Sequence, residues 1–405
     1  MIYRCPNCNG ALEYNPLSDK MECAYCGNDY FVWELENTAV EPSYDSVDLK
    51  GDVNESVDFT KQRTIYDEPE LMECKIYTCT SCGAELAVND TEVSTYCAYC
   101  GQPTIVYNRV SKEQKPKYII PFKITKEQVV NAIREKFGKG IFTPNAVKNF
   151  EVDKIRGIYI PYYLFDVYYH DCEKMYVKEG VGDNAKTVNY IVEAECEFKQ
   201  ISCDASKKLS DESTQRLEPY DLRMLRKFEA AYMSGFYADR YDLSARQLTS
   251  VMKGRCKELY DSQIKRVVRD DNAYIYQSKP DFKVLKAEYA LLPVWFMTFR
   301  YHNNPYTILV NGQTGKVVGA VPFSKLKFAT MYLSIAIPMC ILVTMAILGL
   351  YHSLGDDIKV FSIVLIIALA LHLLGLSFIS TYNKNMKLTK LNVTAKFVKE
   401  RQDEE

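Results

Sequence analysis

Two long uncharged stretches near the C-terminus are the clearest feature of the hydrophobic pattern. Phe328 to Leu350 and Val360 to Tyr382 each hold 23 residues without a charged side chain. At 1.5 Å rise per residue, a helix of this length reaches about 34 Å, which exceeds the roughly 30 Å hydrocarbon core of a bilayer. Two such stretches separated by nine residues fit poorly into a water-soluble core. They predict two transmembrane helices, 328–350 and 360–382.

The charges beside these stretches predict their orientation. Two lysines precede the first stretch and three follow the second, whereas the connecting loop has one lysine and two aspartates: Lys325 and Lys327, then Lys384, Lys387 and Lys390, and in the loop Asp356, Asp357 and Lys359. By the positive-inside rule, both ends of the chain face the cytoplasm, including the charged tail 383–405. The N-terminus shows no secretory signal pattern. The sequence therefore predicts a two-span protein of the cell membrane with its cysteines in a reducing compartment.

Residues 118–325 have the mixed pattern of an α+β domain that is rich in aromatic residues. Thr125 and Gln128 form the pattern of a capping box at the start of a helix, and Ser244 and Gln247 form another. After Ser244, apolar residues recur at helical spacing: Leu248, Val251, Met252, Cys256, Leu259 and Val267.

A weak internal repeat lies within this domain at an offset of 132 residues. GIYIPYYLFDVYYH (157–170) resembles YALLPVWFMTFRYH (289–302), and both segments predict aromatic strands that start at a proline, Pro161 or Pro293. His170 and His302 occupy equivalent positions. They are either a pseudo-symmetric ligand pair or structural histidines, and the absence of an accompanying acid or nucleophile favours the second interpretation.

The segment Asn311-Gly-Gln-Thr-Gly-Lys316 has the appearance of a phosphate-binding loop. It has too few residues between its glycines, and Val follows the lysine where the Walker pattern needs Ser or Thr. A β-hairpin between 306–310 and 317–318 explains it better. No catalytic constellation is visible in the sequence, which predicts a protein that is not an enzyme.

Cysteine spacing carries the strongest chemical signal. Eight of the 14 cysteines form C-x-x-C pairs in two sets with the same 14-residue separation: Cys5, Cys8, Cys23 and Cys26, and then Cys79, Cys82, Cys97 and Cys100. Each pair forms a tight knuckle that directs two sulfur atoms at one metal ion, and two knuckles complete a tetrahedron. The sequence predicts two structural Zn²⁺ sites in β-ribbons at 1–33 and 74–110. Redox-active cysteines and rubredoxin-like iron are the alternatives.

The residue after each second cysteine must turn sharply. Gly27, Gly83 and Gly101 suit that conformation, and Asn9 is the next best residue. The β-prone runs 30–32 and 104–106 are expected as ribbon strands.

Charge constrains the partners. The formal net charge is −2, and two sites with four thiolates and one Zn²⁺ each bring it to about −6. Residues 34–73 hold 12 acidic and three basic side chains, which predicts a flexible acidic linker, with a docking segment for a basic partner as the alternative. Residues 220–269 hold 11 basic and six acidic groups, which predicts a solvated helical face or a contact with anionic lipid or an acidic partner. This balance argues against nucleic acid binding on electrostatic grounds.

Together, these motifs resemble a family of Gram-positive bacterial membrane proteins whose zinc ribbons are similar to that of transcription factor IIB, and which are often labelled as primosomal helicase or phage replication proteins. The resemblance rests on the C-x-x-C pairs, YIIPFKITKEQ (118–128), IPYYLFD (160–166), VNGQTGKVVG (310–319) and the hydrophobic hairpin. It implies partners of the phage-shock protein A type or the flotillin type, and a role in envelope stress.

The sequence as a whole favours a membrane-anchored adaptor that presents cytosolic zinc ribbons to protein partners. A membrane-tethered nucleic-acid-binding or replication-associated protein and a lipid or small-molecule sensor are the alternatives, and homo-oligomerisation stays open. We therefore expect a multidomain fold of two β zinc ribbons, an α+β middle domain and a transmembrane hairpin.

Overall fold

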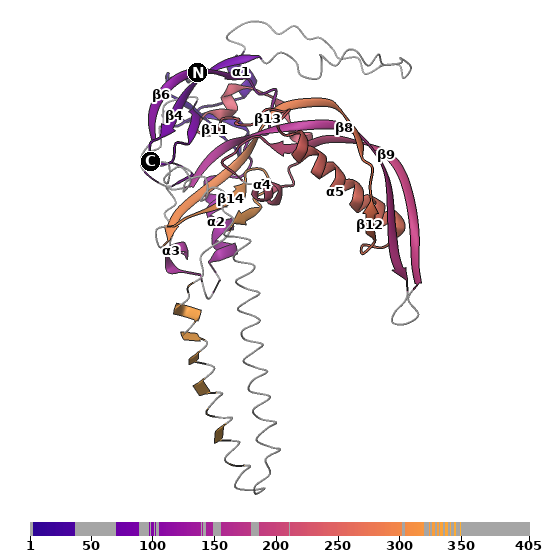
Figure 1. Ribbon diagram of the computed structural model, residues 1–405. Coiled ribbons are helices and arrows are strands. Elements are labelled where there is room, and N and C mark those ends of the chain that lie inside the picture. Colours follow the sequence, from indigo (N-terminus) through magenta and orange to yellow (C-terminus); the bar gives the residue numbers. More distant parts are fainter. Residues whose placement is uncertain are drawn as a thin grey trace, which may run out of the picture.

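The computed structural model describes residues 3–36, 70–88, 97, 99–100, 102, 105–138, 140, 143–148, 155–179, 186–209, 211–301 and 304–319, with single positions between 324 and 349. These residues form a three-stranded sheet, a large mixed sheet of 12 strands and helices beside it (Figure 1). The small sheet comprises β1 (Leu12–Asn15), β2 (Lys20–Cys23) and β3 (Asp29–Tyr30), and α1 (Val32–Glu36) follows it.

The large sheet has the strand order β10-β7-β13-β8-β11-β5-β4-β6, with β9 and β12 on β8, and β14 and β15 beyond β13. Its strands are β4 (Leu71–Cys79), β5 (Glu85–Val88), β6 (Ile105–Gln114), β7 (Tyr118–Ile119), β8 (Ile155–Glu179), β9 (Lys186–Asp204), β10 (Arg226–Lys227), β11 (Tyr237–Asp239), β12 (Tyr274–Gln277), β13 (Asp281–Tyr301), β14 (Asn304–Asn311) and β15 (Val317–Gly319). The helices are α2 (Lys126–Phe137), α3 (Asn145–Lys148), α4 (Asp211–Leu217), α5 (Thr249–Val268) and the 3₁₀ turns η3 (Leu222–Met224) and η4 (Ala230–Met233).

The two copies of the internal repeat are neighbouring antiparallel strands, β8 and β13. Ile160 lies opposite Leu292, and these two residues are equivalent positions of the repeat. A local pseudo-twofold axis through this pair therefore relates the copies. The strands pair directly with each other, so no pocket separates Pro161 from Pro293.

Both prolines lie inside their strands, so the prediction that the strands start at them is wrong. On its other edge, β8 passes from β11 to β9 around Pro161, and β13 passes from β7 to β14 around Pro293. Proline has no N–H to donate to a neighbouring strand. A long central strand can accommodate a proline at the position where its partner strand changes, because a hydrogen bond between strands is not needed there. Each proline carbonyl accepts a backbone hydrogen bond, from Ala205 at 2.9 Å and from Gly312 at 2.8 Å.

Aromatic rings fill the core beside the paired repeat strands β8 and β13. Phe122 stacks on Phe236 at 4.1 Å between ring centroids and meets Trp295 edge to face at 5.1 Å. A Cβ atom at Gly157 would lie 2.5 Å from Phe236, and one at Gly312 would lie 2.6 Å from Phe122. These two glycines are therefore required for the rings to approach the sheet.

Helix α2 begins as predicted, because Thr125 and Gln128 form both hydrogen bonds of the capping box. Helix α5 begins at Thr249, one turn after the predicted Ser244, whose bonds to Gln247 lie in the preceding turn.

The buried stripe of α5 also differs from the predicted one. Met252, Cys256, Tyr260 and Ile264 face the sheet at intervals of four residues. Leu259 and Val267 belong to the predicted apolar series but are exposed. The Tyr260 hydroxyl ties the helix to the sheet, because its one proton lies between the carbonyl oxygens of Asp171 and Ala194, which are 2.9 and 3.1 Å from the hydroxyl oxygen.

The predicted hairpin between 306–310 and 317–318 is confirmed as β14 and β15. The Asn311 side chain accepts hydrogen bonds from the N–H groups of Gln313 and Thr314, and Gly315 has a φ of 74°. The backbone N–H groups of this turn therefore bond to a side chain of the turn itself, whereas those of a phosphate-binding loop point at the bound anion.

Within the part of the chain that the structure describes, no helix is long and apolar enough to cross a membrane. Of the two predicted spans, 360–382 lies outside the described residues, and 328–350 is described only at single positions. The tail 383–405 also lies outside them.

Candidate metal centres

The first cysteine set comes together at one end of the small sheet. The sulfur atoms of Cys5, Cys8, Cys23 and Cys26 all lie within 4.8 Å of one another. The Sγ atoms of Cys5 and Cys26 are 3.5 Å apart, and those of Cys8 and Cys23 are 3.4 Å apart. The predicted ligand set is therefore confirmed as a cluster.

The second set forms an equivalent cluster in the large sheet. Cys79, Cys82, Cys97 and Cys100 also have all four sulfur atoms within 4.8 Å. The Sγ distances are 3.6 Å between Cys79 and Cys100, and 3.7 Å between Cys82 and Cys97.

These sulfur distances fit a tetrahedral metal ion. Four bonds of about 2.3 Å at tetrahedral angles place the sulfur atoms roughly 3.8 Å apart. A disulfide would bring two sulfur atoms to about 2.05 Å. The clusters therefore have the geometry of four-cysteine metal sites and not of disulfide pairs.

The same backbone hydrogen bonds close the turn of each C-x-x-C knuckle. The Cys5 N–H donates to Gly10 O at 2.8 Å, and the Asn9 N–H donates to Cys5 O at 2.8 Å. The equivalent bonds recur at Cys23 and Cys79, and Cys97 N–H donates to Gln102 O at 2.8 Å. Positive φ angles of 58°, 73° and 66° occur at the predicted turn residues Asn9, Gly27 and Gly83. Gly101 lies outside the described residues.

The flanking strands differ in detail from the prediction. Residue Val32 opens α1 instead of extending the ribbon strand, because Glu34 accepts a hydrogen bond from the Phe31 N–H at 2.8 Å and starts the helix there. In the second unit, the strand expected at 104–106 is present from Ile105 and continues to Gln114.

The sulfur electrostatics favour a bound cation. Burial opposes ionisation of Cys5, but the Tyr30 hydroxyl and the N–H groups of Cys8 and Asn7 outweigh it and lower the pKa of Cys5 to about 6. In the second cluster, hydrogen bonding to Cys100 raises the pKa of both Cys82 and Cys97. Four neighbouring thiols cannot all ionise without a compensating positive charge, and a divalent metal supplies it while displacing their protons.

Burial separates the two centres. All four cysteines of the second set are buried, whereas Cys8 is exposed and Cys26 is only partly buried in the first set. Solvent and chelators therefore reach the first centre more easily.

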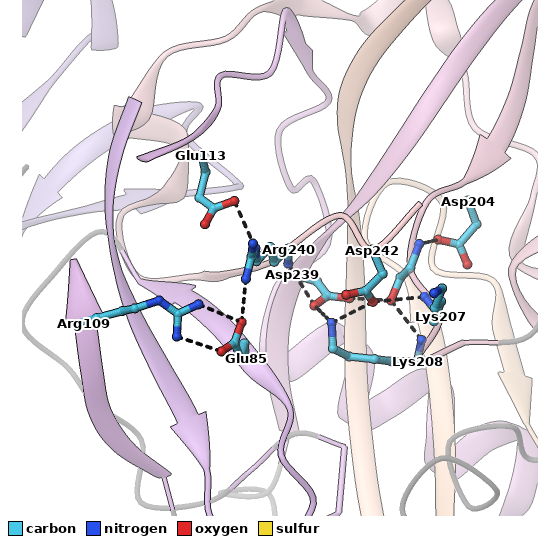
Figure 2. Close-up of polar contacts among 10 residues, drawn as sticks. Glu85, Arg109, Glu113, Asp204, Lys207, Lys208, Asp239, Arg240 and Asp242 are labelled. Atoms are coloured by element: carbon cyan, nitrogen blue, oxygen red, sulfur yellow. Dashed lines mark hydrogen bonds and ion pairs between the residues drawn. The ribbon is translucent and has the colours of Figure 1, made fainter. Parts of the chain in front are cut away.

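The second centre is built into the large sheet. Strand β5 pairs with β11 of the middle domain, with Leu86 opposite Asp239. Arg240 follows β11 and pairs with one residue of β5 and one of β6. Its nitrogen atoms lie 2.8 Å from Glu85 and 3.0 Å from Glu113 (Figure 2). Arg109 of β6 also pairs with Glu85, at 3.0 Å. This network fixes the second cysteine unit to the middle domain.

A buried lysine extends the same network (Figure 2). Lys208 Nζ lies 2.8 Å from Asp239 and 3.0 Å from Asp242. Burial acts to lower the pKa of Lys208, but the two aspartates outweigh it and raise the pKa. The Ser206 hydroxyl donates to Asp239 at 2.6 Å, and the Ser206 N–H donates to Asp204 at 2.9 Å.

The first ribbon is attached by a smaller set of contacts. Arg226 of β10 pairs with Asp19, which lies in the turn between β1 and β2. The Tyr14 N–H donates to Ser234 O at 3.2 Å, and the Tyr14 ring meets Tyr232 edge to face at 5.3 Å. These contacts hold the ribbon against the η4 region.

Ion pairs occupy much of the predicted basic region. Within 220–269, five cations pair with carboxylates in the same chain: Arg223, Arg226, Arg240, Arg255 and Lys257. A paired cation contributes less to the potential that attracts phosphates than a free one does.

The other predicted features fall in different places. His170 lies 3.1 Å from Glu193, and His302 lies outside the described residues. Of the predicted linker, 34–36 lie in α1 and 71–73 begin β4, whereas 37–69 lie outside the described residues. A cleft of about 570 Å³ lies between β4 and the η4 region, lined in part by Met72, Cys74 and Met233.

Comparison with known proteins gives a distant homologue. YdjG of Bacillus subtilis (strain 168), itself described as an uncharacterized protein, is 29% identical over 347 residues. The alignment covers 82% of this chain and 94% of YdjG. No family model and no solved structure matches the chain.

Proposed function

We propose that this protein is a membrane-anchored adaptor without enzymatic activity, and that its two four-cysteine centres bind structural Zn²⁺. The observation that carries the proposal is the contrast between the two centres. The second is locked into the large sheet, and the first stands in its own small sheet with exposed side chains around it. A filled sulfur tetrahedron leaves no coordination position for a substrate, so the metal's role is to hold a presenting surface in shape.

The uncharged stretches 328–350 and 360–382 supply the proposed anchor, with both termini in the cytoplasm. Such an anchor confines the ribbons to a layer beside the bilayer and raises the local concentration of any membrane partner. A partner of the phage-shock protein A type or the flotillin type, implied by the family resemblance, would meet the ribbons in that layer.

Fractionation of cells tests the anchor and the adaptor role together. The full chain is expected in the membrane fraction, and a chain ending at residue 323 is expected in the soluble fraction. Proteins that co-purify with the full chain from membranes should co-purify with the truncated chain from the soluble fraction. A full chain in the soluble fraction, or a full chain that recovers no specific protein, would contradict the proposal.

A further inference from the structure

The first ribbon carries several exposed large apolar side chains. Leu17, Tyr25, Phe31 and Trp33 are 67%, 80%, 42% and 60% exposed. Isolated apolar residues on a surface are common, but a unit as small as residues 3–36 has little area over which to spread four of them.

Two of these side chains form a preorganised pair. The rings of Phe31 and Trp33 stack with centroids 5.9 Å apart and 16° between their planes. Lys20 Nζ lies over the Phe31 ring at 4.7 Å and also pairs with Asp29. The cap between Glu34 and the Phe31 N–H fixes the backbone between the strand and α1. We call Phe31 and Trp33 the aromatic platform.

A fixed aromatic pair is suited to binding. Exposed tryptophan and tyrosine dominate the energetics of protein interfaces because they bury a large area at a small cost in conformational entropy. Since the two rings already stack in the free chain, a partner does not have to order them.

The charge around the platform selects the partner. Residues 3–36 hold six acidic and two basic side chains, one of the acidic ones, Asp19, is paired with Arg226 of β10, and a four-cysteine centre with a divalent ion adds a charge of −2. Both basic side chains have partners in the ribbon, Lys20 on Asp29 and Arg4 on Asn9 O. Such a surface repels the phosphates of anionic lipids and of nucleic acids and attracts a cationic surface.

We propose that the aromatic platform docks a basic amphipathic helix of a partner protein, an inference that rests on the adaptor role proposed above. The apolar face of the helix would cover Phe31 and Trp33, and its lysines or arginines would face the acidic residues of the ribbon. This is the helix-on-surface mode in which apolar anchors give affinity and charge gives orientation.

The tryptophan content of the chain makes the test specific. The chain has two tryptophans, and Trp295 is only 6% exposed, with its indole N–H bonded to Ile124 O at 2.8 Å. Quenching of fluorescence by acrylamide therefore reports on Trp33. The probe is a tryptophan-free peptide of roughly 18 residues with leucines on one helical face and lysines on the other. The full chain is held in nanodiscs of zwitterionic lipid.

The Lys/Leu peptide should protect Trp33 from quenching with a Kd of roughly 10 μM or tighter at low salt, and added salt should weaken it. Phe31→Ala, which keeps the reporter, should weaken binding at least about tenfold. Tyr274→Ala removes an aromatic side chain of β12 that is even more exposed than Phe31, at 58%, and should leave binding unchanged. Zinc content equal to that of the original chain verifies that the Phe31→Ala ribbon is folded.

Three results would overturn the proposal: no protection by the Lys/Leu peptide, equal affinity in Phe31→Ala, or equal binding of a peptide with glutamates in place of lysines. Protection of Trp33 that grows with protein concentration without peptide would assign the platform to a second copy of this chain and would also overturn it. If the peptide gives no protection but the full chain still recovers specific partner proteins from membranes, the platform proposal is rejected and the adaptor role is retained.

Discussion

Arg226 and Asp19, 207 residues apart in sequence, form a bidentate ion pair that joins the first ribbon to the large sheet. The two guanidinium nitrogens lie 2.9 and 2.6 Å from the two carboxylate oxygens. Burial acts to raise the pKa of Asp19, but Arg226 and the Tyr14 hydroxyl outweigh it and lower the pKa. The pair therefore stabilises the docked position of the ribbon at neutral pH.

Removing this pair should loosen the ribbon without unfolding the large sheet. Both side chains are more than a third exposed, so we expect Asp19→Asn to cost only about 0.5 to 1 kcal/mol. Hydrogen exchange should become faster in residues 3–36 and stay unchanged in β8 and β13. Asp29→Asn removes a carboxylate that pairs with Lys20 inside the ribbon, and it serves as the control. Equal exchange rates in the two variants would contradict the assignment.

The two centres should release zinc at different rates. The first includes the exposed Cys8, and the second is fully buried, so a chelator should strip one ion per chain quickly and the other slowly. Absorbance of a metallochromic chelator should show two phases of equal amplitude. Cys8→Ser should remove the fast phase and keep the slow one. A single phase that releases both ions would show that the centres are equally accessible.

Lys208 should be more important for stability than its neighbour. Replacing Lys208 by Met leaves the carboxylate of Asp239 buried without its cation, which costs about 3 to 5 kcal/mol. Lys207→Met changes an exposed side chain and should lie within about 0.5 kcal/mol of the original protein. Thermal unfolding of the purified full chain measures both. Similar midpoints for the two variants would contradict a stabilising role for the Lys208 network.

Glu173 should make stability fall as the pH rises from about 5 to about 7. Burial and the nearby Asp261 raise the pKa of Glu173 to about 7, although Lys257 opposes them. Between its ordinary pKa of 4.5 and about 7, the folded chain holds a proton that the unfolded chain releases. Stability from this group is therefore full below the ordinary pKa, is lost progressively as the pH rises from there, and is gone once the pH has passed through about 7.

Comparison of Glu173→Gln with the original chain isolates this effect, because the two four-cysteine centres are common to both. The unfolding midpoint of the original chain should fall more steeply between about pH 5 and pH 7 than that of Glu173→Gln, and the two curves should run parallel above that range. Parallel curves inside this range as well would mean that Glu173 does not titrate in it.

Local patterns in the sequence predicted local structure well. The spacing of Cys5, Cys8, Cys23 and Cys26 identified a cluster because each knuckle is closed by bonds within six residues. The capping box at Thr125 and the hairpin after Asn311 are equally local. The proline repeat was visible in the sequence, but not the pairing of Ile160 with Leu292, since that pairing depends on how two distant strands meet.

The contacts that distinguish the two ribbons were not predicted. Asp19 bonds to Arg226, and Glu85 bonds to Arg240, across more than 150 residues in each pair. Charged residues in a sequence do not identify their partners, and the 220–269 segment therefore looked like a free basic surface. The run Asp239-Arg240-Tyr241-Asp242, which follows Phe236-Tyr237-Ala238, was the available sign that charges are buried there.

Recovery of partners from membranes tests the central claim most directly, which is that the first four-cysteine unit presents a surface and the second supports the fold. The full chain and its Cys5→Ser, Cys8→Ser variant are purified from solubilised membranes, and zinc content and co-purifying proteins are measured. We predict that the variant stays in the membrane fraction with one zinc ion per chain and loses its partners. Unchanged partner recovery in a variant that has lost the first zinc ion would contradict the account.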